Sequence, residues 1–251
     1  RLLVGAALGH AGLDVLDIVR VFRGLTHGGW DVQKNQNFHI YTLVLGSQTL
    51  HATGYAMGVG LDGDTATGDP EKDVAVIVYF GDGSTSQGDV SEAMVFAASY
   101  NTSELFFLQN NQWAISVPVV RQSRTPLYLR SGGFGIPGVQ IDGNDVLVSY
   151  AASRKFLEET RAGLGPRFIE AVTYRMGAYT SSDDPTKYRT DAEVAHWAAL
   201  PPIIRVEAYL RARGQSDGFF AETADEAAEF AADIRKRTLA LRRVRLAVSD
   251  G

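Results

Sequence analysis

The residues best suited to chemistry form two short polar motifs, each of which follows an apolar run. Gly81-Asp82-Gly83 comes directly after residues 74–80 (VAVIVYF), and Asn110-Asn111 comes directly after residues 105–109 (LFFLQ). Apolar runs of this length, rich in β-branched and aromatic residues, are typical of strands covered on both faces. Because ligands bind outside the carboxyl ends of parallel strands, we expect both motifs at one edge of a sheet.

The two motifs carry oxygen ligands that suit a divalent cation bound to a diphosphate. Mg²⁺ prefers hard oxygen ligands and commonly shares them with phosphate oxygens. Asp82 offers a carboxylate, Asn111 an amide oxygen, and Trp113 a backbone carbonyl two residues further on. We expect Gly81 and Gly83 to let the chain turn sharply, so that backbone N–H groups approach a phosphate. The pattern therefore predicts a magnesium–diphosphate site, as in a thiamine diphosphate enzyme.

Other interpretations of the two motifs are weaker. Asp-Gly and Asn-Asn are common turn sequences, so either motif alone would predict only a turn. The third glycine of a dinucleotide-binding G-x-G-x-x-G is replaced by Ser86, and the phosphate-loop pattern G-x-x-x-x-G-K-[ST] does not occur. The prediction of a cofactor site rests on the two motifs together, each in its strand context.

Predicted strands and helices alternate along the chain. Besides the two strands above, we expect helices at 13–22, 49–59, 89–99 and 146–161 and strands at 138–141 and 168–174. Capping-box patterns begin at Asp89, Thr190 and Thr223. This alternation predicts an α/β fold with a mostly parallel sheet flanked by helices. We expect one thiamine diphosphate-binding domain over residues 1–251, ending in a helix at about 223–247.

Composition narrows the class of protein. The chain has 251 residues, of which 45% are hydrophobic and 21% charged, which fits a folded protein with a full core. A net charge of −5 gives no general attraction to nucleic acid or to an anionic membrane. No apolar run reaches the roughly 20 residues of a membrane span. Because the chain has no cysteine, disulfides, thiolate metal sites and cysteine nucleophiles are excluded.

The ordered motifs resemble the alpha subunit of the thiamine diphosphate-dependent component of 2-oxo acid dehydrogenase complexes. The branched-chain (2-oxoisovalerate dehydrogenase) type is the most similar, and the resemblance covers nearly the whole chain. It is carried by residues 81–83, 110–116, 142–145, 169–175, 182–184 and 188–189.

The resemblance implies a set of site residues. Mg²⁺ would be held by Asp82, Asn111 and the Trp113 carbonyl, and the diphosphate would lie near Gly81, Gly83, Ser84 and Arg175. Leu45 would lie near the aminopyrimidine ring. Thr42, Ser47 and Gln48 match positions that hold a structural K⁺ in the branched-chain type. For these three the alternative is a helix cap, since Ser47 precedes an apolar run.

The resemblance also implies the reaction and the partners. The family decarboxylates a small 2-oxo acid on thiamine diphosphate and passes the acyl group to a lipoyl acyltransferase core. Its active unit contains two alpha and two beta chains, and a glutamate of the beta subunit activates the cofactor. This chain is therefore expected to be inactive alone. We expect a cytoplasmic location in a bacterium, or the mitochondrial matrix in a eukaryote.

Two positions depart from the family pattern. Tyr179 stands where the family has an acid/base histidine, and a phenol titrates near about 10 whereas an imidazole titrates near about 6.5. We expect Tyr179 to face the substrate with weakened or altered catalysis. Gln109 replaces an arginine that often reaches the diphosphate. A pyruvate or acetoin dehydrogenase, or a non-catalytic cofactor-binding subunit, remains the alternative. Asp183, Tyr188 and Arg189 are expected to hold the loop at 175–189 together.

Overall fold

The computed structural model describes residues 14–25, 30–35, 37–39 and 44–241. The chain divides into two compact units, one made of residues 1–41 and 211–251 and the other of residues 42–210. All of the predicted site residues belong to the second unit, although Thr42 lies outside the described residues. In the part that is described, no helix is long and apolar enough to cross a membrane. The single domain over residues 1–251 stays a prediction.

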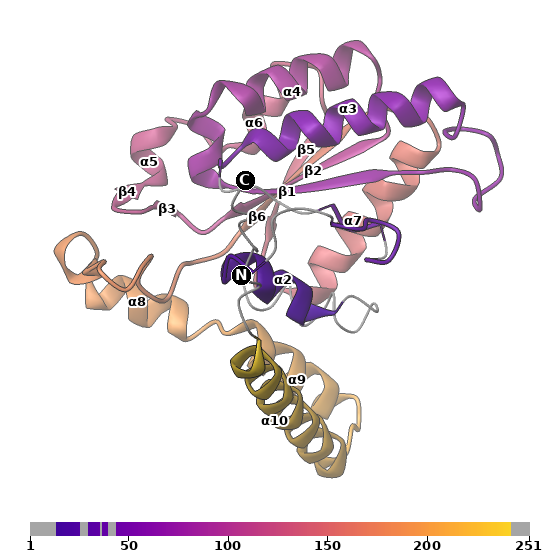
Figure 1. Cartoon of the computed structure of the whole chain (residues 1–251). Helices are drawn as coiled ribbons and strands as arrows, with labels where there is room; N and C mark the ends of the chain where they lie inside the picture. The colour runs from indigo at the N-terminus through magenta and orange to yellow at the C-terminus, as the bar shows by residue number, and fades with distance from the viewer. Residues whose placement is uncertain (1–13, 26–29, 36, 40–43, 242–251) are drawn as a thin grey trace, which may run out of the picture. The chain divides into compact units, whose positions relative to one another are not determined.

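A four-stranded parallel sheet forms the centre of the second unit (Figure 1). Its strands are β1 (Val76–Gly81), β2 (Glu104–Asn110), β6 (Arg167–Val172) and β5 (Gly138–Asp142), in that spatial order. Gly81 of β1 pairs with Gln109 of β2, so the two strands end at nearly the same level. The predicted α/β class and the parallel sheet are confirmed, and both polar motifs follow the carboxyl ends of adjacent strands.

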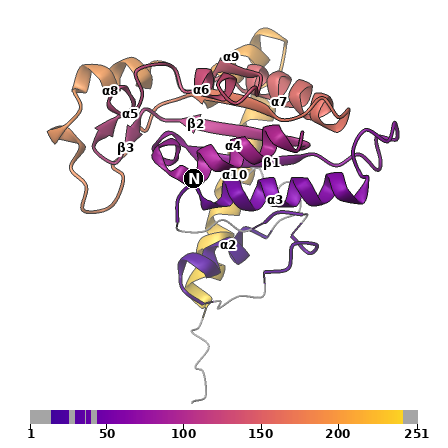
Figure 2. The same cartoon turned by 90° about the horizontal axis from the view of Figure 1, so that it is seen from above.

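Helices cover both faces of this sheet (Figures 1 and 2). One face packs against α3 (Ser47–Asp62), α4 (Gly88–Ser99) and α6 (Tyr128–Gly132), and the other against α7 (Val146–Arg161). The first core contains Phe80, Phe106, Leu108 and Phe168, and the second contains Leu105, Phe156 and Ile169. Alternate residues of β2 thus enter opposite cores, which explains why the strand is apolar throughout.

Short elements fill the connections at the carboxyl edge of the sheet. They are the 3-10 helix η1 (Asp82–Ser86) after β1, and β3 (Trp113–Ala114), β4 (Val117–Pro118) and α5 (Val119–Gln122) after β2. After β6 follow η2 (Pro185–Lys187), α8 (Asp191–Ala198) and α9 (Pro202–Ala212), the last of which crosses the boundary between the units. Thr190 caps α8 by accepting a hydrogen bond from the Glu193 backbone, as predicted.

The first unit contains α2 (Val15–Phe22) and α10 (Asp217–Ala240). Arg237 of α10 donates to the Asp14 carboxylate at 2.6 Å. The predicted helix start at Thr223 is wrong, because α10 begins after Ser216, whose side chain accepts from the Phe219 backbone N–H. The predicted end at 247 lies outside the described residues.

The predicted cap at Asp89 is also wrong. Helix α4 starts one residue earlier, at Gly88, and its N-cap is Gln87. The reason lies in η1, because the Gln87 backbone N–H bonds to the Ser84 carbonyl and the extended backbone at Gln87 leads straight into the next helix. Asp89 therefore lies in the first helical turn, where its charge still suits the helix dipole.

Candidate active site

Asp82 and Asn111 lie on neighbouring strand ends, as predicted. Asp82 is the first residue of η1, immediately after β1, and Asn111 is the first residue after β2. Backbone pairing holds the carboxyl ends of these two strands level, so a residue following one strand lies beside a residue following the other. The sheet alone therefore brings a carboxylate and an amide to one place, although they are distant in sequence.

The Asp82 carboxyl is buried, with 1% of the residue exposed. Burial raises its pKa, while a hydrogen bond from Gln122, the backbone of Asn111 and the charge of Arg175 act in the opposite direction. Gln122 Nε2 lies 3.1 Å from Asp82 Oδ2. Among the described residues, no Lys or Arg forms an ion pair with Asp82. A bound cation would therefore relieve the cost of burying this carboxylate.

The chain after β2 is folded into two successive side-chain turns. Asn110 Oδ1 accepts the Gln112 backbone N–H at 2.9 Å, and Asn111 Oδ1 accepts the Trp113 backbone N–H at 3.1 Å. Gln112 takes a left-handed backbone conformation, with φ of 69°. These turns fix the Asn111 amide oxygen, which retains a second lone pair for a ligand.

The donor set fits Mg²⁺. The Asp82 carboxylate, the Asn111 amide oxygen and the Trp113 carbonyl are hard oxygen ligands. Within the described ranges, no group of three or more His, Cys, Asp or Glu side chains could bind a metal ion. A metal held here would therefore combine one carboxylate with neutral oxygens and need further oxygens from elsewhere, which is how Mg²⁺ binds when it also holds phosphate.

Gly83 is required by close packing. A Cβ atom on Gly83 would lie 2.9 Å from Ala114 Cβ, so a side chain would push η1 away from the β3–β4 hairpin. Gly81 has an ordinary extended backbone, with φ of −94°, and a Cβ there would meet nothing within 4 Å. The chain does turn here, from β1 into η1, but neither the backbone conformation nor the packing at Gly81 requires a glycine. The neighbouring Ser84 is buried within η1.

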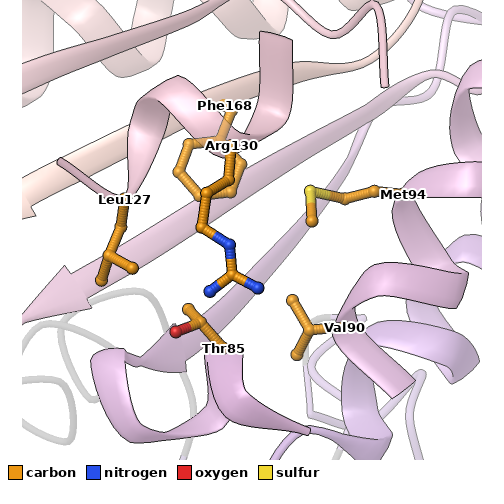
Figure 3. Close-up of a pocket in the computed structure, with 6 residues that line it drawn as sticks. All are labelled: Thr85, Val90, Met94, Leu127, Arg130 and Phe168. Atoms are coloured by element: carbon orange, nitrogen blue, oxygen red, sulfur yellow. The ribbon is translucent and has the colours of Figure 1, made fainter. Parts of the chain in front are cut away.

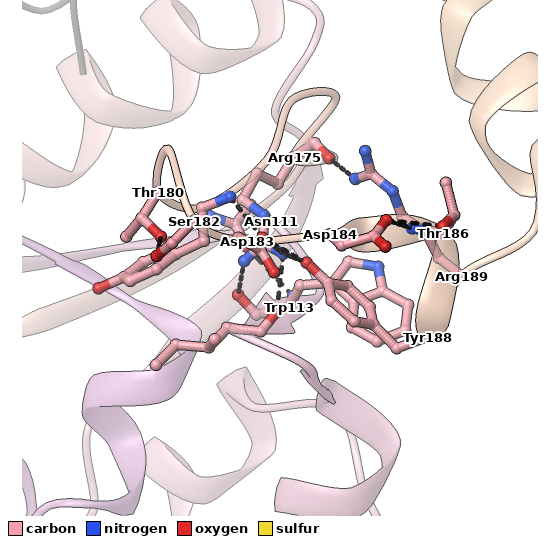
Figure 4. Close-up of polar contacts among 12 residues, drawn as sticks. Asn111, Trp113, Arg175, Thr180, Ser182, Asp183, Asp184, Thr186, Tyr188 and Arg189 are labelled. Carbon is pink, nitrogen blue, oxygen red and sulfur yellow. Dashed lines mark hydrogen bonds and ion pairs between the residues drawn. The ribbon is translucent and has the colours of Figure 1, made fainter.

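The Arg175 side chain lies against the same hairpin (Figure 4). Its guanidinium donates to the Ile115 carbonyl at 2.7 Å and to the Trp113 carbonyl at 3.3 Å. The Arg175 Nε atom is buried and has no hydrogen-bond partner among the described residues. The structure therefore brings Arg175 to the Asp82–Asn111 region, and its unpaired N–H group fits an anionic oxygen.

The loop at 175–189 is closed by its own polar side chains (Figure 4). The Tyr188 hydroxyl accepts from Arg175 at 2.8 Å and donates to Asp183 at 2.6 Å. The bond from Tyr188, with one from the Tyr179 backbone, lowers the pKa of Asp183. Arg189 donates to the carbonyls of Arg175 and Met176. Asp183, Tyr188 and Arg189 thus hold the loop together, as predicted.

Tyr179 lies on this loop, with 38% of the residue exposed. The Arg175 Cζ atom is 5.5 Å from the centroid of its ring, a cation–π distance. The Tyr179 backbone N–H donates to Asp183 at 2.7 Å. The ring thus lies beside Arg175, the arginine that also bonds to the β3–β4 hairpin.

Residues 19–236 match the family described as the dehydrogenase E1 component. The chain belongs to this family. It is 44% identical over 212 residues to the 3-methyl-2-oxobutanoate dehydrogenase subunit alpha of Mycobacterium tuberculosis, covering 84% of this chain and 53% of that protein.

Two further E1 relatives are named for pyruvate. The pyruvate dehydrogenase E1 component subunit alpha of Staphylococcus epidermidis is 40% identical over 174 residues, or 68% of this chain and 45% of the relative. The protein of the same name from Acholeplasma laidlawii is 41% identical over 175 residues, or 68% of this chain and 48% of the relative. The chain spans about half the length of these curated relatives.

Two of the three candidate K⁺ residues, Ser47 and Gln48, lie at the start of α3. Thr42 is outside the described residues. The Ser47 hydroxyl donates to the Val44 carbonyl at 2.8 Å. Gln48 accepts from the Gly46 backbone N–H and donates to the Tyr79 carbonyl. The alternative of a helix cap is wrong for Ser47, because Gly46 is the N-cap of α3. Leu45, in the preceding loop, is 42% exposed.

A small cavity lies between η1, α4 and α6 (Figure 3). It is lined by Thr85, Val90, Met94, Leu127, Arg130 and Phe168. Most of these side chains are apolar, and the Arg130 guanidinium points toward Thr85 in Figure 3. None of the predicted cofactor or metal ligands lines the cavity, so it is separate from the candidate E1 site.

Two side chains that form hydrogen bonds to the polar motifs of this E1 chain were not predicted from the sequence. Gln122 bonds to Asp82 from α5, and the buried Glu170 bonds to Asn110 from β6. Gln122 ends the short helix α5, where no local sequence pattern singles it out. A signal for Glu170 did exist, since a lone acidic residue interrupts the apolar run of residues 168–172.

Proposed function

We propose that this chain is the alpha subunit of a branched-chain 2-oxo acid dehydrogenase that uses thiamine diphosphate and Mg²⁺. The proposal rests on one observation in this member of the E1 family: the buried Asp82 carboxylate and the Asn111 amide follow the carboxyl ends of adjacent strands. The branched-chain choice is supported by the relative from Mycobacterium tuberculosis, which matches 84% of the chain. The bacterial relatives support a cytoplasmic location.

Asp82, Asn111 and the Trp113 carbonyl would hold Mg²⁺ on the cofactor diphosphate. Arg175 would direct its unpaired Nε–H to a diphosphate oxygen, while the backbone around Gly81, Gly83 and Ser84 approaches the same group. Bound thiamine diphosphate supplies the electron sink that allows a 2-oxo acid to lose carbon dioxide. Leu45 would line the aminopyrimidine ring. Ser47 and Gln48, with Thr42, would place oxygens around K⁺.

Tyr179 would act on the substrate side of the site. Its ring is held by Arg175 and its backbone by Asp183, so the hydroxyl is presented from a fixed loop. A phenol hydroxyl readily donates a hydrogen bond to an anionic or carbonyl oxygen. Tyr179 would therefore orient a carboxylate or acyl oxygen of the substrate.

The partners are part of the proposal. The active unit would contain two alpha and two beta chains, with the beta subunit supplying the glutamate that activates the cofactor. The acyl group would pass to a lipoyl acyltransferase core. The names of the relatives, which are all alpha subunits, support a separate beta partner.

Two other functions are favoured by particular observations. The relatives from Staphylococcus epidermidis and Acholeplasma laidlawii favour pyruvate as the substrate. The replacement of the family histidine by Tyr179 favours a subunit that binds the cofactor without turning over a substrate.

Turnover separates these functions. The chain would be reconstituted with its beta partner, thiamine diphosphate and Mg²⁺, and reduction of an artificial electron acceptor would be followed with 3-methyl-2-oxobutanoate or pyruvate. We expect cofactor-dependent turnover, with the larger kcat/KM for 3-methyl-2-oxobutanoate. A larger value for pyruvate would replace the branched-chain assignment. Cofactor binding without turnover of either substrate would support the non-catalytic subunit.

A further inference from the structure

A buried glutamate lies in the middle of the sheet and bonds to Asn110, the residue before the candidate metal ligand Asn111. Glu170 is on β6, with 1% of the residue exposed, and pairs with Leu108 of β2 on one side and Gln140 of β5 on the other. Its side chain lies on the face covered by α6. Charged side chains are almost never fully buried without polar partners, so this position requires an explanation.

Glu170 accepts three hydrogen bonds, each from a different element. Asn110 Nδ2 donates to Oε1 at 2.7 Å, while the Tyr128 backbone N–H and Gln140 Nε2 donate to Oε2 at 2.9 and 3.1 Å. All three partners are donors, so both oxygens of the carboxyl group serve as acceptors. The group therefore has the surroundings of a carboxylate.

The bond to Asn110 determines the orientation of an amide. The Asn110 side chain has two ends, and only the oxygen end can accept the Gln112 N–H that closes the first turn after β2. Because Glu170 presents only acceptors, it holds the nitrogen end of Asn110 toward itself and the oxygen end toward Gln112. That turn immediately precedes the Trp113 carbonyl and contains Asn111.

We propose that Glu170 is a positioning residue, which orients the Asn110 amide and thereby fixes the turn that carries the Asn111 and Trp113 metal ligands. This inference rests on the proposed function of that turn. Glu170 itself touches none of the proposed ligand atoms; it acts through Asn110. Groups that bond directly to metal ligands typically change metal affinity by about 10–100-fold when they are removed, and Glu170 acts one bond further out, through Asn110.

The test uses an exchange of amide and carboxylate between the two positions. In Glu170→Gln, the new NH₂ group must face a donor whichever way the amide is turned: it meets either Asn110 Nδ2 or the fixed Tyr128 backbone N–H. Asn110 can relieve the first conflict only by flipping, which turns its NH₂ group toward the Gln112 N–H. In the double variant Asn110→Asp/Glu170→Gln, the amide at position 170 can donate to the carboxylate at position 110 and still accept from Tyr128 and Gln140. The carboxylate at position 110 accepts from both sides, so each hydrogen bond has a donor and an acceptor again.

The measurement is the Mg²⁺ concentration that half-saturates thiamine diphosphate binding to the full-length subunit assembled with its beta partner. We expect Glu170→Gln to raise that concentration at least about tenfold. The double variant should return to within about threefold of the wild type. Melting temperatures of the cofactor-free complexes, measured alongside, separate metal affinity from general stability.

Glu104→Gln is the matched control. Glu104 is also a fully buried glutamate of the same sheet, but it lies at the opposite end of β2 and bonds to Thr53. We expect its Mg²⁺ dependence to match the wild type. The inference is overturned if Glu170→Gln leaves the Mg²⁺ dependence unchanged, or if the folded double variant binds Mg²⁺ as weakly as a folded Glu170→Gln.

Two further outcomes are distinct. If Glu170→Gln does not fold, the double variant alone tests the role of Glu170. A double variant that folds and binds Mg²⁺ like the wild type supports that role. A double variant that folds but binds Mg²⁺ weakly overturns it. If the wild-type complex itself shows no Mg²⁺-dependent binding of thiamine diphosphate, the proposed function fails, and the role inferred for Glu170 fails with it.

Discussion

The Arg175 guanidinium carbon lies 5.5 Å from the centroid of the Tyr179 ring. The same arginine donates to the Trp113 carbonyl, and its charge opposes the rise that burial causes in the pKa of Asp82. Arg175 therefore links the loop that carries Tyr179 to the edge of the sheet that carries the candidate metal ligands. A change in the Tyr179 side chain can be tested for chemistry and for packing separately, because phenylalanine at this position removes the hydroxyl and keeps the ring beside Arg175.

Tyr179→His should raise kcat of the reconstituted complex at neutral pH. An imidazole titrates near about 6.5 and general acid–base catalysis typically contributes about 10²–10⁴-fold, so we expect a gain of about tenfold or more. Turnover with 3-methyl-2-oxobutanoate measures it. Tyr179→Phe is the control, since it keeps the ring beside Arg175 and should leave the melting temperature unchanged. If kcat does not rise in Tyr179→His but falls in Tyr179→Phe, the Tyr179 hydroxyl itself contributes to the reaction.

Asp82→Asn should abolish Mg²⁺-dependent binding of thiamine diphosphate without destabilising the cofactor-free protein. Burial raises the pKa of Asp82, so its charge is costly until a cation is bound. We expect the free energy of unfolding without cofactor to stay within about 1 kcal/mol of the wild type or to rise. Calorimetric titration and denaturant unfolding measure the two quantities. Cofactor binding that survives the substitution with its Mg²⁺ dependence intact would refute the site.

Stability should fall as pH rises because of Glu104. Burial raises the pKa of this carboxyl group to about 8, while hydrogen bonds from Thr53 and Thr102 act in the opposite direction. Between the ordinary glutamate pKa of about 4.3 and about 8, the folded state holds a proton that the unfolded state has lost, so the free energy of unfolding decreases with pH.

Glu104→Gln isolates this effect because the amide does not titrate in that range. The free energy of unfolding of the wild type, minus that of the variant, should decline between about pH 5 and 8 by up to about 1.4 kcal/mol per pH unit. Urea unfolding at several pH values provides the measurement. Parallel pH profiles for the two proteins would show that Glu104 does not titrate as its burial predicts.

Tyr188→Phe should loosen the loop at 175–189 while leaving the sheet intact. The Tyr188 hydroxyl bridges Arg175 and Asp183, and its removal leaves two polar groups without a shared partner. We expect faster limited proteolysis within the loop. Thr186→Ala, elsewhere on the loop, is the control, and equal cleavage rates in Tyr188→Phe and wild type would contradict the bridging role.

Sequence patterns predicted the sheet and its polar edge because these depend on local apolar periodicity. The runs at 74–80 and 105–109 became β1 and β2 within a few residues, and the helix at 146–161 matches α7. Capping patterns were less reliable. Thr190 does cap α8. Thr223 instead lies inside α10, where its hydroxyl donates a hydrogen bond to the Phe219 carbonyl of the preceding turn.

The contacts around the candidate site could not be predicted, because they join residues far apart in the chain. Gln122 reaches Asp82 only after the hairpin and α5 fold back over η1. Glu170 reaches Asn110 only when β6 pairs beside β2. A single sequence indicates which residues carry suitable chemistry, but the pairing of distant strands decides which of them meet.

The bond between Asn110 and Glu170 also bears on how the two central strands find their alignment. Side chains alternate along a strand, so sliding β2 by one residue against β6 would turn Asn110 to the opposite face and bring Gln109 or Asn111 toward the buried carboxylate. Phe106 and Leu108 would leave their core at the same time. The hydrogen bond between Asn110 and Glu170 therefore favours the native register of β2 against β6. Correct pairing of these strands is thereby coupled to correct formation of the proposed metal site.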